Sequence, residues 1–140
     1  MRRSKHTKPV ISVVIPAYNE ERFISACLSA LQKQQDPPLY EIIVADNNST
    51  DKTSTIAKQH GVRVVVARQK GYAHAAIAGI ARARGRFIVM TDADTIVPPL
   101  WLSTISEAFK KHPDAVAVAG PFQFCDGPMS LRIIVDVANR

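Results

Sequence analysis

The chain has 140 residues, of which 46% are apolar and 21% are charged, and its formal net charge is +6 at neutral pH. This length is about one domain's worth, and the composition is that of a globular protein with a hydrophobic core, not of a disordered chain. No apolar run approaches the roughly 18 residues that a membrane-spanning helix needs, and no apolar segment follows the basic N-terminus as it would in a signal peptide.

The beginning of the chain is basic, with cationic side chains at Arg2, Arg3, Lys5 and Lys8. We expect residues 1–9 to form a disordered terminus, and we expect no nucleic acid as a partner. Peripheral contact of this segment with acidic lipid at the inner membrane surface stays open as an alternative. The two cysteines, Cys27 and Cys125, lack metal-ligand spacing, so a reducing, cytoplasmic compartment is the simpler assumption.

Apolar runs rich in β-branched residues alternate along the chain with apolar residues at helical spacing. The runs predict five strands, at residues 10–16, 40–45, 62–67, 87–90 and 116–119. The helical patterns predict four helices, the first starting near Asn19 and the others at residues 50–60, 72–84 and 101–111. Asn19 is expected to cap the first helix, and Ser49 or Thr50 the second.

Strands that alternate with helices indicate the α/β class: a mainly parallel sheet with helices on both faces, because parallel strands need crossover connections. We expect a single domain at residues 10–120 with no internal linker. The apolar run at residues 131–137 is too short to assign between helix and strand.

Two carboxylates, Asp92 and Asp94, follow the strand at residues 87–90 with one residue between them. If the extended conformation continues, residues two apart point to the same side, and two such charges repel unless one keeps a proton or a cation is bound. Oxygen ligands suit Mg²⁺ or Mn²⁺, so this pair predicts a metal site. A simple turn before the helix that Pro98 and Pro99 introduce is the alternative.

Polar residues also follow two other predicted strands, at residues 16–20 and 46–51. In an open parallel sheet these loops meet at the edge formed by the carboxyl ends of the strands, where ligands bind. Neither the dinucleotide-binding glycine motif nor the P-loop motif is present. Phosphates of a bound ligand would therefore be held by a metal and by cationic side chains.

Three ordered motifs together resemble family 2 glycosyltransferases of the GT-A fold: VISVVIPAYNEE at residues 10–21, EIIVADNNSTDKT at 41–53 and GRFIVMTDADTIVP at 85–98. The resemblance covers residues 10–120. It implies a nucleotide-diphospho-sugar donor, transfer to an acceptor hydroxyl with inversion, and help from Mn²⁺ or Mg²⁺. It also implies that residues 121–140 begin an acceptor-side region or a tail, so that the fold is incomplete at the C-terminus.

The resemblance further implies which residues bind the donor. The nucleotide pocket would be lined by Pro16, Ala17, Tyr18 and Glu20, and Asp46 would contact the base. Asn47 stands where many members have a second acid. Lys70 and Gly71 match a loop near the donor. In the motif formed by Asp92, Ala93 and Asp94, the last acid would bind the metal, and the first the ribose or the water shell of the metal.

The catalytic base that inversion requires is not identified in this sequence. After Asp114 the carboxylates are Asp126 and Asp136, and neither forms a recognisable acid pair. We expect the base beyond Arg140, which would make the chain the donor-binding half of a longer enzyme or a truncated form. Two alternatives stay open: a non-catalytic nucleotide-sugar-binding module that needs a partner or a second copy of itself, and a nucleotidyltransferase. The sequence leaves the acceptor open among saccharide, lipid-phosphate and protein.

Overall fold

A computed structural model describes residues 8–120 of the chain. They belong to two compact units, divided between Trp101 and Leu102. The first unit holds the sheet and the helices that cover it. In the second, the described residues comprise helix α4 (Trp101–Lys111) from Leu102 onward and the segment up to Gly120. Within the described residues, no helix is long and apolar enough to cross a membrane.

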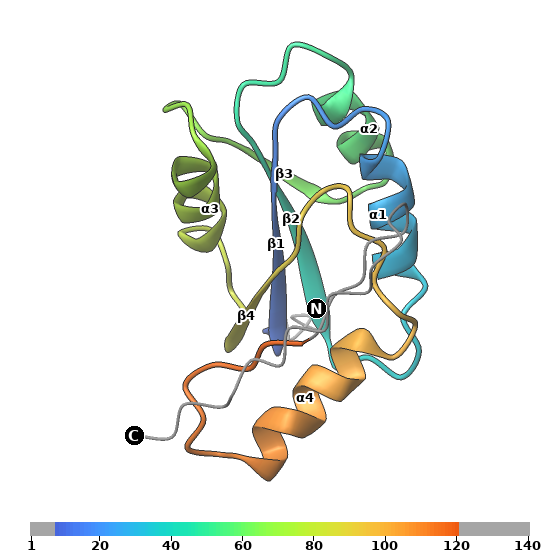
Figure 1. The fold of residues 1–140 in the computed structure, drawn as a ribbon, viewed down its shortest axis with the longest axis vertical. Coiled ribbons are helices and arrows are strands. Elements are labelled where there is room, and N and C mark those ends of the chain that lie inside the picture. Colours follow the sequence, from blue (N-terminus) through green and yellow to red (C-terminus); the bar gives the residue numbers. More distant parts are fainter. Residues whose placement is uncertain (1–7, 121–140) are drawn as a thin grey trace, which may run out of the picture. The chain divides into compact units, whose positions relative to one another are not determined.

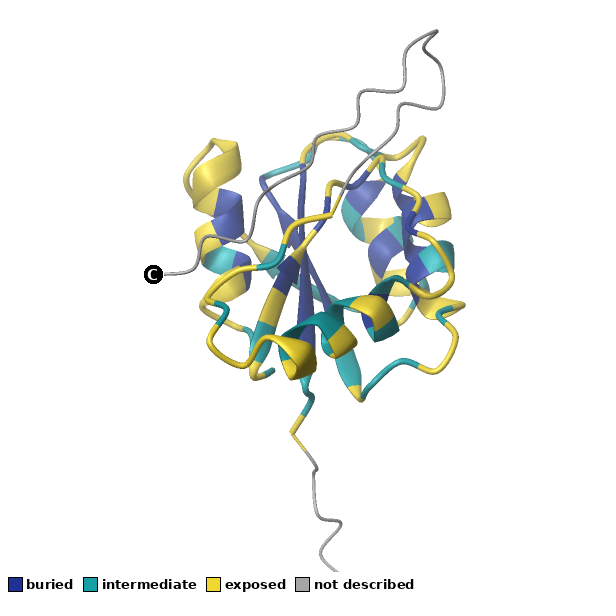
Figure 2. Ribbon diagram, turned by 60° about the horizontal axis from the view of Figure 1, so that its bottom comes forward, coloured by how far each residue is buried: buried dark blue, intermediate teal, exposed yellow. Residues whose placement is uncertain are grey.

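The first unit is built on a sheet of four parallel strands: β1 (Ile11–Ala17), β2 (Tyr40–Asp46), β3 (Arg63–Val66) and β4 (Phe87–Met90). Their order is β3-β2-β1-β4, and every neighbouring pair is parallel. β1 lies between two other strands and is buried along its whole length (Figure 2). Its seven residues are mostly apolar and β-branched, as expected of a strand that is covered on both faces. The predicted parallel sheet is confirmed.

Helices cover both faces of this sheet, also as predicted. Helix α3 (Tyr72–Ile80) packs against β1, β2 and β3, while α1 (Ile24–Gln32) and α2 (Thr53–Gln59) lie together on the opposite side (Figure 1). α3 approaches the sheet closely because its inner face carries small residues. A Cβ added at Gly79 would lie 2.5 Å from Val14 Cγ1.

The strand expected at residues 116–119 is wrong. These residues form no strand, and Val116 is 88% exposed. The reason is that a strand exists only with a partner, and no described strand pairs with this segment. The helix expected at residues 72–84 ends at Ile80 instead. The helix gives way to tighter turns, in which the N–H groups of Arg82 and Ala83 donate to carbonyls three residues earlier. The main-chain N–H of Arg84 then donates to side chains of the sheet.

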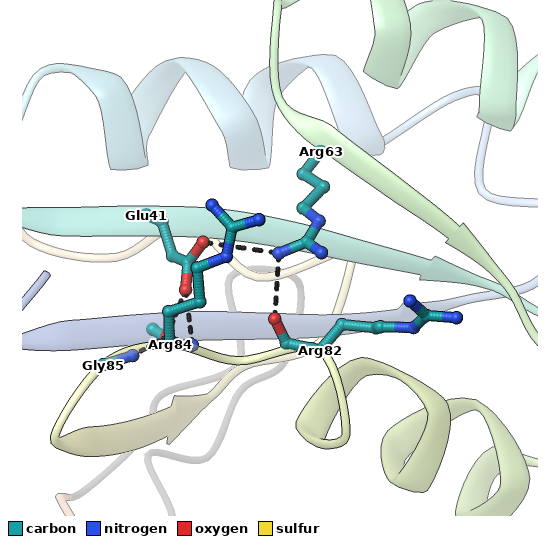
Figure 3. Close-up of polar contacts among 6 residues, drawn as sticks. Glu41, Arg63, Arg82, Arg84 and Gly85 are labelled. Carbon is teal, nitrogen blue, oxygen red and sulfur yellow. Dashed lines mark hydrogen bonds and ion pairs between the residues drawn. The ribbon is translucent and has the colours of Figure 1, made fainter. Parts of the chain in front are cut away.

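A polar network around the buried hydroxyl of Ser12 fixes the turn that leads into β4 (Figure 3). The Ser12 hydroxyl, fully buried in β1, donates to Glu41 Oε1 at 2.7 Å and accepts from the Gly85 N–H at 2.8 Å. The Arg84 N–H donates to the same Glu41 oxygen at 2.7 Å, and the Arg63 guanidinium lies 3.7 Å from Glu41 Oε2. The network pins the chain just before β4, and so fixes the register in which Ile88 lies opposite Ser12.

Candidate functional site

A cavity of about 480 Å³ opens at the carboxyl ends of the strands. Ten of the eleven residues expected to bind a nucleotide-sugar line it, and two further residues, Tyr72 and Ala75, complete its wall. The ten are Pro16, Ala17, Tyr18, Glu20, Asn47, Lys70, Gly71, Asp92, Ala93 and Asp94. The structure therefore brings segments that are far apart in the sequence to one hollow, as the topology of a parallel sheet requires.

Asp46 is the predicted residue that does not line this cavity. It ends β2, is 4% exposed, and its Oδ1 accepts a hydrogen bond from the Ser49 N–H at 3.2 Å. The buried carboxylate therefore shapes the loop after β2. A contact between Asp46 and a nucleotide base stays a prediction.

The loops after β1 and β2 hold each other through side chains. The Asn19 N–H donates to Ser49 Oγ at 3.0 Å, and Asn19 Oδ1 accepts from the Thr50 N–H at 2.8 Å. Asn19 is thus not the cap of the first helix, which begins at Ile24: its side chain is occupied by Thr50, and its φ is +56°. Ser49 and Thr50 are in the same way occupied by Asn19, and α2 begins only at Thr53. The predicted caps instead join the loops that follow β1 and β2.

The acidic pair lies in a turn and not in a continued strand. β4 ends at Met90, and the Thr95 N–H donates to the Asp92 carbonyl at 3.2 Å. The extended conformation predicted for Asp92 and Asp94 is therefore wrong beyond Met90, yet both side chains are exposed and both line the cavity.

Tyr72, the first residue of α3, donates its hydroxyl to Asp92 Oδ1 at 3.2 Å. Tyr72 is not among the site residues that the sequence predicts. Its position directly after Gly71 at a helix start was the available signal, but that position does not reveal a partner twenty residues away in the chain. Partial burial, followed by the charge of Asp92 and the hydrogen bond to it, raises the pKa of the Tyr72 hydroxyl.

The cavity is electrostatically negative. Partial burial raises the pKa of Glu20, and the nearby charges of Asp94, Asp51 and Asp92 raise it further. Such a site gains from a bound cation, which would relieve the repulsion among these groups. Among the described residues, no three His, Cys, Asp or Glu side chains converge on one metal position. Two carboxylates nevertheless fit Mg²⁺ or Mn²⁺, which commonly complete their shell with water and substrate phosphates.

Cys27 lies in α1 behind the acidic pair, and its thiol donates to the Asp92 carbonyl at 3.5 Å. Burial, with smaller effects of Asp94 and Asp92, raises its pKa to about 12. Since the thiolate is the reactive form, we expect iodoacetamide at pH 8 to leave Cys27 unmodified in the folded chain. Peptide mass spectrometry after alkylation, with and without urea, would measure this. Rapid alkylation without urea would show that α1 opens readily.

The sequence matches Glycosyl transferase family 2 over residues 12–132. An uncharacterized glycosyltransferase of Mycobacterium bovis is 42% identical over 84 residues, covering 60% of this chain and 36% of the relative. The low-salt glycan biosynthesis hexosyltransferase Agl6 of Haloferax volcanii is 41% identical over 88 residues, covering 61% of this chain and 21% of the relative. The chain thus spans about a third or less of the length of these two relatives.

Solved structures share the fold. TarS of Staphylococcus aureus superposes with a TM-score of 0.77 at 25% identity, covering 87% of this chain and 38% of that one. Glucosyl-3-phosphoglycerate synthase of Mycobacterium tuberculosis, crystallised with Mn²⁺, uridine diphosphate and phosphoglyceric acid, superposes with a TM-score of 0.58 at 34% identity. This superposition covers 64% of our chain and 34% of the synthase. With a family match that spans most of its length, the chain belongs to glycosyl transferase family 2.

Proposed function

We propose that this chain is the donor-binding part of an inverting glycosyltransferase. It would bind a nucleotide-diphospho-sugar in the cavity at the carboxyl ends of the strands, and the sugar would pass to an acceptor hydroxyl. The observation that carries this proposal is the composition of the cavity, where the residues expected from the family meet around two exposed carboxylates and one lysine.

The side chains that line the cavity suit a nucleoside diphosphate as the leaving group. A nucleoside diphosphate gains negative charge as the glycosidic bond breaks, and a divalent ion, Mn²⁺ or Mg²⁺, supplies the Lewis acid that stabilises it. Asp94 would hold this ion directly, with Asp92 reaching the ribose or a metal-bound water. Lys70, on the loop before α3, would bring a positive charge to the phosphates, and Tyr18 would contact the nucleoside. The Mn²⁺ and uridine diphosphate bound by the mycobacterial synthase support this assignment.

The acceptor side of the reaction lies outside the described residues. Inversion needs a general base to take the proton of the attacking hydroxyl, and we propose that a carboxylate beyond Arg140 supplies it. Asp126 and Asp136 also lie outside the described residues. The acceptor is a saccharide, a lipid-phosphate or a protein, with cell-envelope polysaccharide as one candidate. A cytoplasmic location, with the basic terminus against the inner membrane face, would suit a lipid-linked acceptor.

One observation favours a second candidate function. Among residues 8–120, which the structure describes, no side chain is assigned to the general base that transfer with inversion requires. Binding of the nucleotide-sugar without transfer, in a complex with another chain or another copy, would need no such base.

Calorimetric titration with UDP-, GDP- and dTDP-sugars, with and without Mn²⁺, tests the proposal. We expect one nucleotide class to bind, and its affinity to rise with Mn²⁺. Release of the nucleoside diphosphate in the presence of acceptors would identify an enzyme, and binding without release a binding module. Pyrophosphate release from a nucleoside triphosphate and a sugar phosphate would select a nucleotidyltransferase. If none of these sugars binds to the folded chain, the proposal is wrong.

A further inference from the structure

The side chain of Asn47 ties the loop between β3 and α3 to the end of β2. Asn47 Nδ2 donates to the Gln69 carbonyl at 2.6 Å, and Asn47 Oδ1 accepts from the Gly71 N–H at 2.6 Å. Asn47 is 6% exposed, and its own N–H donates to the Ala17 carbonyl of β1 at 2.8 Å. The amide is thus fixed by the sheet and holds the loop at two points, on either side of Lys70.

The loop has the conformation that this attachment requires. Gly71 has a φ of +123°, which L-residues rarely adopt, and in this conformation its N–H donates to Asn47. The neighbouring Asn48 holds the start of the same loop, since its Nδ2 donates to the Ala67 carbonyl at 2.8 Å. Two consecutive asparagines therefore hold the loop at both ends, and Asn47 holds the end that lines the cavity.

We propose that Asn47 is a positioning residue: it acts on the donor through the loop, by holding Lys70 at the cavity wall, and not by contacting the base. The resemblance places Asn47 among the donor-binding residues and assigns it no particular contact. Both polar atoms of the Asn47 side chain are already engaged by the main chain of the loop. A base could therefore bind them only in addition to, or in place of, the loop.

The proposal explains why an amide suits this position better than a carboxylate. An aspartate at position 47 could still accept from the Gly71 N–H, but it has no N–H to offer the Gln69 carbonyl and would face that carbonyl with a negative charge. The loop would then be released at residue 69. A released loop must be ordered again when the diphosphate binds, and this entropic cost would appear as weaker binding.

The first test needs no ligand. In the full chain, NMR amide exchange of Gly71 should become at least about tenfold faster in Asn47→Ala, because its N–H loses its acceptor. Asn47→Asp, which keeps the size of the side chain, should retain that bond but lower the melting temperature of the protein. Gln69→Ala is the matched control, since Asn47 binds the main-chain carbonyl of residue 69 and not its side chain. Unchanged Gly71 exchange in Asn47→Ala would overturn the proposal.

The second test rests on the proposed function and separates the loop from the base. With Mn²⁺ present, Asn47→Ala should weaken UDP binding about tenfold and leave uridine binding unchanged, since only the diphosphate reaches Lys70. The double variant Asn47→Ala/Lys70→Ala should bind UDP no more weakly than Lys70→Ala alone, because the two residues act as one unit. Equal losses for uridine and UDP would instead indicate a base contact and overturn the proposal. If the unaltered chain binds no nucleotide, the proposed function fails, and the Gly71 exchange still decides whether Asn47 holds the loop.

Discussion

Replacing Asp94 with asparagine should abolish the manganese-dependent part of UDP binding while leaving the melting temperature nearly unchanged. Asp94 is exposed and lines the cavity, so little of the folding free energy depends on it. An amide cannot replace a carboxylate against a divalent ion, and the loss of a direct ligand should exceed the roughly 10- to 100-fold effect of losing an outer-shell partner. Calorimetric titration with UDP, at fixed and at zero Mn²⁺, measures the difference.

Asp36→Asn provides the control for this experiment. Asp36 is also an exposed carboxylate, but it lies in the loop before β2, at the opposite edge of the sheet, and its φ of +46° is tolerated by asparagine. Its replacement should leave both binding and stability unchanged. An Asp94→Asn chain that still binds UDP more tightly with Mn²⁺ would disprove the metal role. A large fall in melting temperature would show that Asp94 is structural.

The elements whose residues alone determine them were predicted well. β4 and α4 have the predicted bounds, since an apolar run of strand length and an amphipathic helical pattern depend little on context. The elements that depend on a distant partner in the chain were predicted poorly. The segment at 116–119 has strand composition but no strand beside it, and the end of α3 is set by Ser12 and Glu41, which are far away in the chain.

The same distinction holds in the site. The position of the cavity followed from the topology, because loops at the carboxyl ends of parallel strands meet wherever such a sheet forms. The hydrogen bonds of Tyr72 with Asp92 and of Asn47 with residues 69 and 71 did not follow, since a sequence pattern shows which groups can donate but not which distant acceptor they reach. Asn19 illustrates the difficulty: an asparagine before a helix is typical of a cap, but here Thr50 occupies it.

Replacing Gly85 with alanine should destabilise the fold by about 3 kcal/mol, in the upper range for inserting a methyl group into a packed site. The added Cβ would lie 2.5 Å from the Ser12 nitrogen and 2.7 Å from the Ile11 carbonyl carbon, both main-chain atoms of the buried central strand. Neither β1 nor the turn can yield without breaking the bonds that Ser12 makes to Glu41 and Gly85. Urea denaturation followed by circular dichroism would measure the loss.

Two other glycines calibrate this result. Among the residues that the structure describes, a Cβ added at Gly120 meets nothing within 4 Å, so Gly120→Ala should change the free energy of unfolding by less than about 0.5 kcal/mol. Gly61→Ala also meets nothing, but Gly61 has a φ of +70°, so it should cost only the roughly 1 kcal/mol of a strained backbone. The additional loss of unfolding free energy in Gly85→Ala then isolates the steric clash with β1.

Because this turn sets the register of β4, Gly85→Ala should also weaken UDP binding at the carboxyl ends of the strands. If Gly85→Ala is as stable as Gly120→Ala, the turn is not fixed against β1 in the way that the network of Ser12 indicates.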